Sequence, residues 1–288
     1  MLVLVGLAVV TVSVFVGFAL AGGPLLLMLQ PIELLIIGGA AAGTLLIGSS
    51  PAVLRQLVRQ LKGTMKPSPY SRSLYIDCLQ LLYELQVKAK RNGLIALEHD
   101  LADPAASPIF SAHPILLGLH EVVTFTSEAL GMLVDGTMRP DDFESVLEAH
   151  LETHHEEERK SAGVLAKIGD SLPGLGIVAA VLGIVITMQH VDGKPEEIGH
   201  HVAVALIGTF IGILFSYGYV QPLSQNLEEQ AAASSRFLSC IKNALVAFAR
   251  GAPPLVAVEV ARHVIFSDDR PTAAELSDAC RNAAKNTA

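Results

Sequence analysis

The chain has 288 residues, of which 51% are hydrophobic, and its mean hydropathy is +0.48. Its formal net charge of −8 argues against a nucleic acid as partner, because domains that bind nucleic acids present basic surfaces. The apolar residues are unevenly distributed along the chain, and this predicts an integral membrane protein with a substantial soluble part.

Four apolar stretches are long enough to cross a bilayer, which takes about 20 residues of helix. They cover residues 2–21, 34–50, 172–190 and 201–221. Strand periodicity is absent from the sequence. We therefore predict an all-α membrane protein with four transmembrane helices and a helical cytoplasmic domain, formed by the loop between spans two and three together with the C-terminal tail.

The expected organisation has four parts. Residues 1–50 hold the first two transmembrane helices, and residues 51–170 form the cytoplasmic helical domain. Residues 171–221 hold the third and fourth transmembrane helices, and residues 222–288 form cytoplasmic C-terminal helices.

Basic residues near the span ends predict the orientation. Arg55 and Arg59 closely follow the second span, and Arg159 and Lys160 precede the third, whereas the loop between the third and fourth spans offers only Lys194. Because basic residues gather on the cytoplasmic side, the long loop and the tail are predicted to be cytoplasmic.

Between the second and third spans, residues 51–69 read as a basic connector. Helical periodicity then runs from Leu74 to about His99 and from Ile115 to Val134. Asp141-Asp142 resembles the N-cap of a long polar helix that begins near Phe143 and leads into the third span.

The tail is predicted to begin with a helix from Leu223 to about Arg250, separated from the fourth span by a kink at Pro222. A shorter helix is expected over Leu255–Phe266. The three cysteines, Cys78, Cys240 and Cys280, are widely separated and predicted to be free thiols.

The spans are informative through the ionisable groups that they lack. An ion-driven membrane machine needs a group in the bilayer that takes up and releases the ion. Asp170 lies at the cytoplasmic lip of the third span and Glu33 at the outer start of the second, and no span has an ionisable residue at its centre. If the protein handles protons, the titrating carboxylate is therefore expected on another chain.

Small residues recur four positions apart in the third and fourth spans, at Gly176, Gly183, Gly208 and Gly212 among others. This spacing lets helix backbones approach closely in lipid. Two interpretations remain open: ordinary packing within one chain, or an oligomer whose third and fourth spans surround a partner helix.

Pro173 and Pro222 stand at the cytoplasmic ends of these two spans, where they would make the helices bendable. Thr209 is a polar residue near the middle of the fourth span. Its hydroxyl is expected either to bond back to a carbonyl one turn earlier or to face a pore and orient ions.

Three charged residues stand out in the predicted cytoplasmic domain: Lys90, Arg91 and Glu98. Arg91 and Glu98 are seven positions apart and would share one face if the helix continued through Gly93. The alternative is a set of surface charges with local pairing, such as Glu84 with Lys88.

Motifs of enzymes are missing from the chain. His150, His154 and His155 cluster, but neither an HExxH motif nor a neighbouring cysteine accompanies them, so no metal site is expected. The sequence contains neither a GxSxG elbow nor a Walker loop, and we predict a protein that is not an enzyme and uses no cofactor.

Taken together, these segments resemble the A-subunit of the bacterial flagellar motor stator, the MotA/PomA family. The resemblance rests on Leu81–Leu85, Lys90–Glu98, Gly169–Pro173, Gly208–Leu214 with Pro222, and Ala252–Glu259 with Arg270-Pro271. It covers nearly the whole chain.

The resemblance implies a multi-pass protein of the inner membrane, with both termini on the cytoplasmic side. A ring of five A-subunits would surround two B-subunits of the MotB type, whose single helices carry the titrating aspartate. Asp170, Pro173, Ala180, Thr209 and Pro222 would then serve the ion pathway and its gating.

The resemblance further implies that Lys90, Arg91 and Glu98 contact the rotor switch complex. Sodium-type relatives carry a threonine where Ala180 stands. Because an alanine offers no oxygen ligand to a dehydrated sodium ion, protons are the expected coupling ion. The competing interpretations are an energising subunit of the ExbB/TolQ type, which typically has three spans, and a membrane scaffold without ion coupling.

Overall fold

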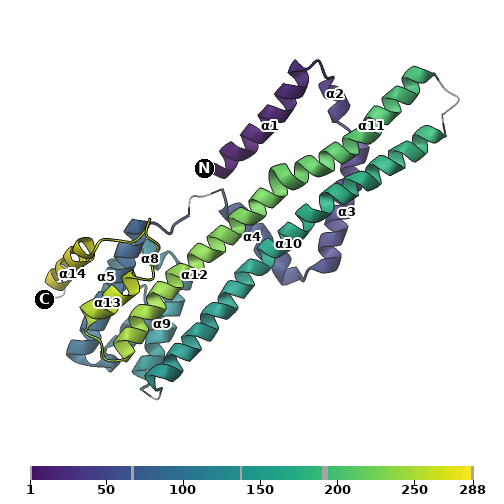
Figure 1. The fold of residues 1–288 in the computed structure, drawn as a ribbon. Coiled ribbons are helices and arrows are strands. Elements are labelled where there is room, and N and C mark those ends of the chain that lie inside the picture. The colour runs from purple at the N-terminus through teal and green to yellow at the C-terminus, as the bar shows by residue number, and fades with distance from the viewer. Residues whose placement is uncertain (1, 66–67, 137, 190–193, 287–288) are drawn as a thin grey trace. The chain divides into compact units, whose positions relative to one another are not determined.

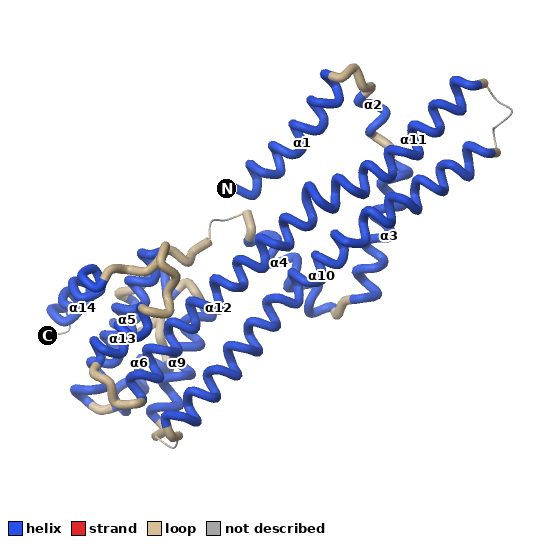
Figure 2. Tube along the Cα trace, viewed as in Figure 1, coloured by secondary structure: helices blue, strands red, loops and turns tan. Residues whose placement is uncertain are grey.

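The computed structural model describes residues 2–65, 68–136, 138–189 and 194–286, and every regular element in this part of the chain is helical (Figures 1 and 2). Contacts between residues divide the chain into two compact units. The first unit comprises Met1–Pro67 and Glu157–Gln230, and the second comprises Ser68–Glu156 and Ala231–Ala288. These units follow contacts, whereas the predicted boundaries at residues 50, 170 and 221 follow the ends of the apolar stretches.

The first unit contains the long apolar helices. Its elements are α1 (Leu2–Leu20), α2 (Leu25–Met28), α3 (Pro31–Gly48), α4 (Pro51–Gly63), the later part of α10 (Pro140–Met188), α11 (Pro195–Ile213), the π-helix η2 (Leu214–Val220) and the beginning of α12 (Gln221–Ala249). By length and composition, four helical segments of the described chain can cross a membrane: Leu2–Leu20, Leu25–Gly48, Pro140–Met188 and Pro195–Ala249.

Helix α1 shows what kind of surface this unit presents. None of its residues is buried, although it consists largely of apolar side chains. Val5, Val9, Val12 and Val16 are each about half exposed. An apolar face of this size is stable in lipid or against another chain and unstable in water.

The segment after the second span is a helix, so its description as a mere connector was wrong. Ser50 caps α4, because its Oγ accepts a hydrogen bond from the backbone N–H of Val53 at 3.4 Å. Leu57 is buried from this helix against Ala162 and Leu227. The apolar positions of residues 51–63 recur at helical spacing, which is the signal that predicts this element.

The second unit is a bundle of shorter helices around one core. Its elements are α5 (Arg72–Asn92), the 3₁₀-helix η1 (Leu94–Leu97), α6 (Glu98–Ala102), α7 (Pro108–Ser111), α8 (Pro114–Leu117), α9 (His120–Val134), the beginning of α10, the later part of α12, α13 (Pro254–Arg262) and α14 (Ala273–Asn286).

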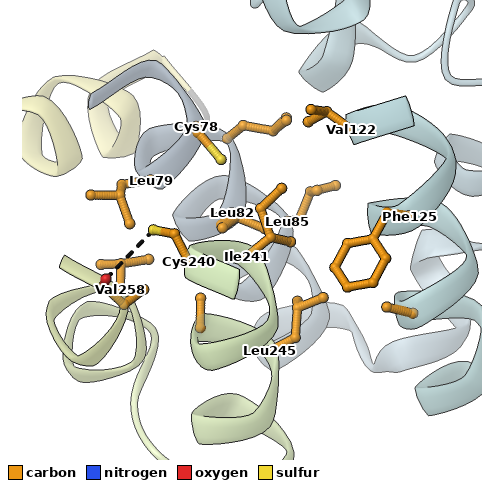
Figure 3. Packing of buried hydrophobic residues seen from close by; sticks show 14 of the residues in the cluster. Cys78, Leu79, Leu82, Leu85, Val122, Phe125, Cys240, Ile241, Leu245 and Val258 are labelled. Atoms are coloured by element: carbon orange, nitrogen blue, oxygen red, sulfur yellow. Dashed lines mark hydrogen bonds between the residues drawn. The ribbon is translucent and has the colours of Figure 1, made fainter. Parts of the chain in front are cut away.

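Figure 3 shows how the core of the second unit draws on several of these helices. Leu82 and Leu85 come from α5, Phe125 from α9, and Ile241 and Leu245 from α12, and all are at most 2% exposed. Their burial supplies the main stabilisation of the unit, roughly 1.5–3 kcal/mol for each such side chain before the cost of ordering the chain.

Several predicted helix ends were wrong for local reasons. Helix α5 ends at Asn92 instead of continuing to His99, because Gly93 takes a φ of +86°, a left-handed conformation that glycine adopts easily. Helix α10 begins at Pro140, so Asp141 and Asp142 lie inside its first turn and do not cap it.

Helix α14 was not predicted, although its first turn carries a recognisable signal. The Thr272 Oγ1 accepts the backbone N–H of Glu275 at 3.2 Å, and the Glu275 Oε2 accepts the backbone N–H of Thr272 at 2.7 Å. This reciprocal pair is a capping box. The predicted helix 255–266 is α13 and ends earlier, at Arg262.

The three cysteines are free and buried, which confirms the prediction of free thiols. Burial raises the pKa of the Cys240 thiol to about 12, and the Cys240 Sγ donates to the carbonyl oxygen of Ala261 at 3.5 Å. Burial also raises the pKa of Cys78 and Cys280. The thiols therefore stay protonated and unreactive in the folded protein.

A buried histidine in the turn before α8 contacts two carboxylates of α5. The His113 side chain is 2% exposed, its Nδ1 lies 2.5 Å from Oδ1 of Asp77, and its Nε2 lies 3.7 Å from Oε2 of Glu84. Burial by itself would lower the pKa of His113, but the two carboxylates outweigh it and raise that pKa to about 9.

We predict that this site makes stability depend on pH. A histidine whose folded pKa lies above its ordinary value of 6.5 stabilises the fold fully below pH 6.5, and this contribution is lost as pH rises through about 9. Thermal unfolding of the full-length protein in detergent should show a loss on the order of 1–3 kcal/mol across that range.

His113→Gln should remove most of this pH dependence, because the glutamine cannot become charged. His120→Gln is the matched control, since His120 is exposed in the same region. An equal pH dependence in wild type and His113→Gln would show that His113 is not its source.

Candidate functional site

The two helices α10 and α11 of the first unit run side by side and approach each other closely at glycines (Figure 1). A Cβ atom on Gly176 would lie 2.8 Å from the carbonyl oxygen of Gly208, and one on Gly212 would lie 2.5 Å from the carbonyl oxygen of Leu172. Both distances are too short for any side chain, so these positions require glycine at this separation of the helices.

The same contact continues along both helices. A Cβ on Gly183 would lie 3.0 Å from the Cβ of Ala205, and one on Gly208 would lie 3.2 Å from the Cβ of Ala179 and 3.3 Å from the backbone nitrogen of Ala180. The structure therefore places Gly176, Gly183, Gly208 and Gly212 in packing within one chain. Ala180 is 7% exposed beside this contact.

Pro173 lies inside α10 and leaves a carbonyl group without its usual partner. Proline has no N–H, so the carbonyl of Gly169, one turn earlier, receives no hydrogen bond from residue 173. The Ser216 Oγ, in η2, donates to this carbonyl oxygen at 2.7 Å. Ser216 is 0% exposed. The polar group that the proline leaves unpaired is thus satisfied by the neighbouring helical segment.

Two further contacts tie the same stretches together. The Gln221 Nε2 donates to Oδ1 of Asp170 at 2.9 Å, and the buried Ser224 Oγ donates to the carbonyl oxygen of Ala162 at 2.8 Å. A Cβ on Gly169 would lie 2.9 Å from the Cγ of Gln221. Asp170 is exposed and has a polar partner, so it belongs to this contact and is not an isolated charge.

The chain leading into Pro222 is a π-helix, η2, where the sequence predicted a kink at the proline. Pro222 follows as the second residue of α12. A π-helical turn changes the hydrogen-bond ladder from i−4 to i−5, and such turns occur often at functional sites. Both prolines of the predicted gate therefore stand beside an irregular hydrogen-bond pattern.

Thr209 is half-buried next to the glycine contact, and its Cα would lie 3.2 Å from a Cβ on Gly176. Thr44 and Thr187 donate to the carbonyl oxygen four residues earlier, at 2.9 and 2.8 Å. For Thr209 the described part of the chain shows no such bond. The alternative in which its hydroxyl bonds back to its own helix is thus not what the structure shows.

Lys90, Arg91 and Glu98 are exposed, and no ion pair is described for any of them among the residues of the structure. The condition for a shared helical face is not met, because Gly93 ends α5 and Glu98 begins α6. The three charges instead flank the turn formed by Gly93 and η1.

The predicted pairing of Glu84 with Lys88 was wrong. The Lys88 Nζ lies 2.5 Å from Oδ2 of Asp100. The other carboxylate oxygen of Asp100, Oδ1, accepts a hydrogen bond from the Ser107 Oγ at 2.7 Å. Asp100 is 2% exposed. This half-buried interaction joins α6 to the last turns of α5 and so holds the turn that carries the three exposed charges.

The histidine cluster of α10 makes ordinary contacts within the second unit. His154 forms an ion pair with Glu121, and the His155 Nδ1 lies 2.9 Å from the Ser235 Oγ. The His150 ring packs at 5.1 Å from the Phe125 ring.

Two residues of the first unit, Ser216 and Glu33, were not selected as site residues from the sequence. Ser216 could have been found from Pro173, because the carbonyl that a proline leaves free in an apolar environment needs a donor. Glu33 was placed at the start of the second span, and the structure does place it in the first turn of α3. Its side chain, however, is 5% exposed and packed against α10 and α11.

Two solved structures share the fold of this chain. The structure of *C. jejuni* MotAB superimposes with a TM-score of 0.78 at 22% identity, covering 94% of this chain and 98% of that one. The flagellar MotAB stator complex from *Bacillus subtilis* gives a TM-score of 0.72 at 21% identity, covering 89% and 92%.

Comparison of sequences identifies the family. The model described as Motility protein A N-terminal matches residues 4–93, and that of the MotA/TolQ/ExbB proton channel family matches residues 120–239. Motility protein A of *Salmonella typhimurium* is 36% identical over 98% of this chain and 95% of its own, and that of *Escherichia coli* is 36% identical over 99% and 97%. With this identity over nearly its whole length, the chain belongs to the Motility protein A family.

Proposed function

We propose that this chain is the A-type subunit of a proton-driven flagellar stator in the bacterial inner membrane. With a B-subunit it would form a proton-conducting complex that converts ion flow into torque on the rotor switch complex. The family assignment supports the stator role. The structural observation that supports the mechanism is the close packing of α10 and α11 at glycines. Pro173 lies within α10, and Pro222 lies in α12, which follows α11 and η2 along the chain.

The assembly follows from what one chain lacks. The described spans have no ionisable side chain at their centres, so the carboxylate that binds the proton in mid-membrane belongs to the B-subunit. We place five A-subunits around two B-subunits, with both termini of the A-subunit on the cytoplasmic side. The exposed apolar face of α1 faces lipid or a neighbouring subunit.

Protons are the proposed coupling ion, and no cofactor is proposed. Ala180 lies at the α10–α11 contact with a methyl group and no side-chain oxygen. A sodium ion stripped of water needs several oxygen ligands, whereas a proton needs one acceptor. Ala180→Thr alone would add one oxygen, which is too few for a sodium site.

The test is swimming of a strain without its own stator genes that carries this chain and its natural B-subunit. We expect swimming in medium without sodium and loss of swimming when a protonophore is added. A requirement for sodium would overturn the ion assignment while keeping the stator. Absence of swimming under both conditions, with the protein inserted in the membrane, would favour an energising role of the ExbB/TolQ type.

Coupling is proposed to pass through the hydrogen bond between Ser216 and the Gly169 carbonyl. It links α10 near Pro173 to the π-helical stretch before Pro222, so a change in one helix reaches the other through this buried bond. Because Pro173 cannot form the ladder bond, this link can break and re-form without disrupting a regular helix.

We predict that Ser216→Ala lowers the free energy of unfolding of the purified complex by about 1–3 kcal/mol, since it leaves a buried carbonyl unpaired. It should also reduce swimming at a normal protein level. In a Pro173→Ala background the restored N–H satisfies Gly169, so Ser216→Ala should cost less than half as much there.

Ser171→Ala is the matched control, because the Ser171 hydroxyl bonds to the Ile168 carbonyl of its own helix at 2.8 Å. Equal costs of Ser216→Ala in the two backgrounds would contradict the proposed link.

The rotor contact is proposed at Lys90, Arg91 and Glu98, which the Lys88–Asp100 ion pair holds at a fixed turn. Exposed charges without a partner in their own chain can pair with a charged surface of another protein at little cost of desolvation. A lysine at position 90 supplies a point charge and lacks the planar donor fork of an arginine.

We predict that Glu98→Lys leaves assembly and proton flux intact and lowers swimming speed at least about twofold, because reversing a contact charge weakens binding by roughly 1 kcal/mol or more. Swimming speed and membrane level are measured together. Glu152→Lys, at an exposed position of α10, serves as the control. Normal swimming of Glu98→Lys would remove this residue from the rotor contact.

A further inference from the structure

Glu33 is a buried carboxylate without a described partner. The described chain has three acidic side chains below 9% exposure: Glu33, Glu84 and Asp100. The latter two, in the second unit, lie beside His113 and Lys88 respectively. Glu33, in the first unit, has neither an ion pair nor a hydrogen bond to its Oε2 among the described residues.

The carboxyl group of Glu33 occupies space that two glycines leave open. Its Oε2 lies 2.8 Å from the position of a Cβ on Gly208 of α11, and its Oε1 lies 3.7 Å from the position of a Cβ on Gly183 of α10. The same Cβ position on Gly208 lies 3.3 Å from the backbone nitrogen of Ala180. The carboxyl group therefore reaches the same gap as the position that we assign to ion selectivity.

Small apolar residues border the two glycine positions that the Glu33 carboxyl approaches. The two glycine positions that the Glu33 oxygens approach are also bordered by buried alanines: Ala205 of α11, 1% exposed, beside Gly183, and Ala179 of α10, 0% exposed, beside Gly208. The nearest titratable residues along these two helices, within the described chain, are His201 on α11 and Asp170 on α10. Helix α3 itself has no other charged residue.

An unpaired carboxylate in such surroundings is costly, because it loses water without gaining a counter-charge. Binding a proton removes this cost. An ionisable residue inside a membrane segment generally serves the passage of an ion or proton. A structural carboxyl would be expected to use both oxygens in hydrogen bonds, and here Oε2 is buried without one.

We propose that Glu33 is a proton-binding group on the ion path, which takes up the coupling proton and passes it toward the gap beside Ala180. This proposal rests on the proton-driven function proposed above. The O–H bond forms on the Glu33 carboxylate with a proton from a hydronium ion on the supplying side, whose own O–H bond breaks to leave water. It breaks when the proton moves to a carboxylate of the B-subunit, and Glu33 is then ionised again and ready for the next proton.

The test uses the complex of this chain with its B-subunit in lipid vesicles, with proton uptake driven by a potassium diffusion potential and followed by a pH-sensitive dye. Glu33→Gln keeps the size of the side chain and cannot bind a proton. We expect its proton flux to fall at least about tenfold, at unchanged assembly. Glu197→Gln, an exposed acidic position in the first turn of α11, is the matched control and should conduct normally.

Glu33→Asp gives a second measurement that does not depend on the glutamine variant assembling. A proton-binding role predicts that its flux persists with a changed dependence on the pH of the supplying side. Infrared spectroscopy of the wild-type complex should show one protonated carboxyl band that is absent from Glu33→Gln.

The outcomes separate this inference from the proposed function. If the wild-type complex conducts protons and Glu33→Gln conducts within about twofold of it, Glu33 is no part of the path. If Glu33→Gln does not assemble, an unchanged pH profile of Glu33→Asp overturns the proposal. If the wild-type complex itself conducts no protons in the same vesicles, the proposed function fails instead.

Discussion

The close approach of α10 and α11 is the constraint on which the first unit depends. At Gly176 and Gly212 the two backbones are near enough that a single methyl group would collide with a carbonyl oxygen or a Cα. In lipid there is no hydrophobic driving force between helices, so this contact is held by dispersion between closely fitted backbones. The positions of Ala180, Thr209 and the Glu33 carboxyl all follow from it, because each lies at the edge of the same contact.

A second principle of this unit is that its polar groups are satisfied by neighbouring segments. Pro173 frees a carbonyl in α10, and Ser216 supplies the hydroxyl from η2. Asp170 accepts from Gln221, and Ser224 donates to Ala162. Each of these bonds joins two segments that would otherwise be held only by apolar packing. They concentrate the polar contacts near the two prolines, where the helices are least regular.

Much of the fold could be predicted from the sequence, and the parts that could not share a cause. The four helical segments of the described chain that can cross a membrane follow from apolar runs as long as a bilayer is thick, and the free cysteines follow from their wide separation. The end of α5 depends on the backbone angle of Gly93. The conformation of a single glycine leaves no periodic signal in the sequence. Periodicity does mark α4, but its many basic residues obscured it.

The residues of the candidate site likewise include some that could be predicted from the sequence and some that could not. The glycines, the prolines and Thr209 could be selected because small residues, proline and a lone hydroxyl are conspicuous in an apolar span. The roles of Ser216 and the burial of Glu33 could not be predicted, because both depend on contacts with residues far away in the sequence. Ser216 contacts Gly169, and the Glu33 carboxyl lies beside Gly183 and Gly208. A residue's position along a span does not reveal which neighbour its side chain meets.

The π-helical stretch Leu214–Val220 has a geometric consequence for the length of the chain. A π-turn holds one residue more than the α-helical turn that it replaces. Successive residues of an α-helix are rotated by about 100°, so loss of that extra residue would turn every following side chain by this angle around the axis. Ser224 would then no longer face Ala162. The number of residues between Gly212 and Pro222 is therefore constrained, and insertions or deletions there would be tolerated less than substitutions.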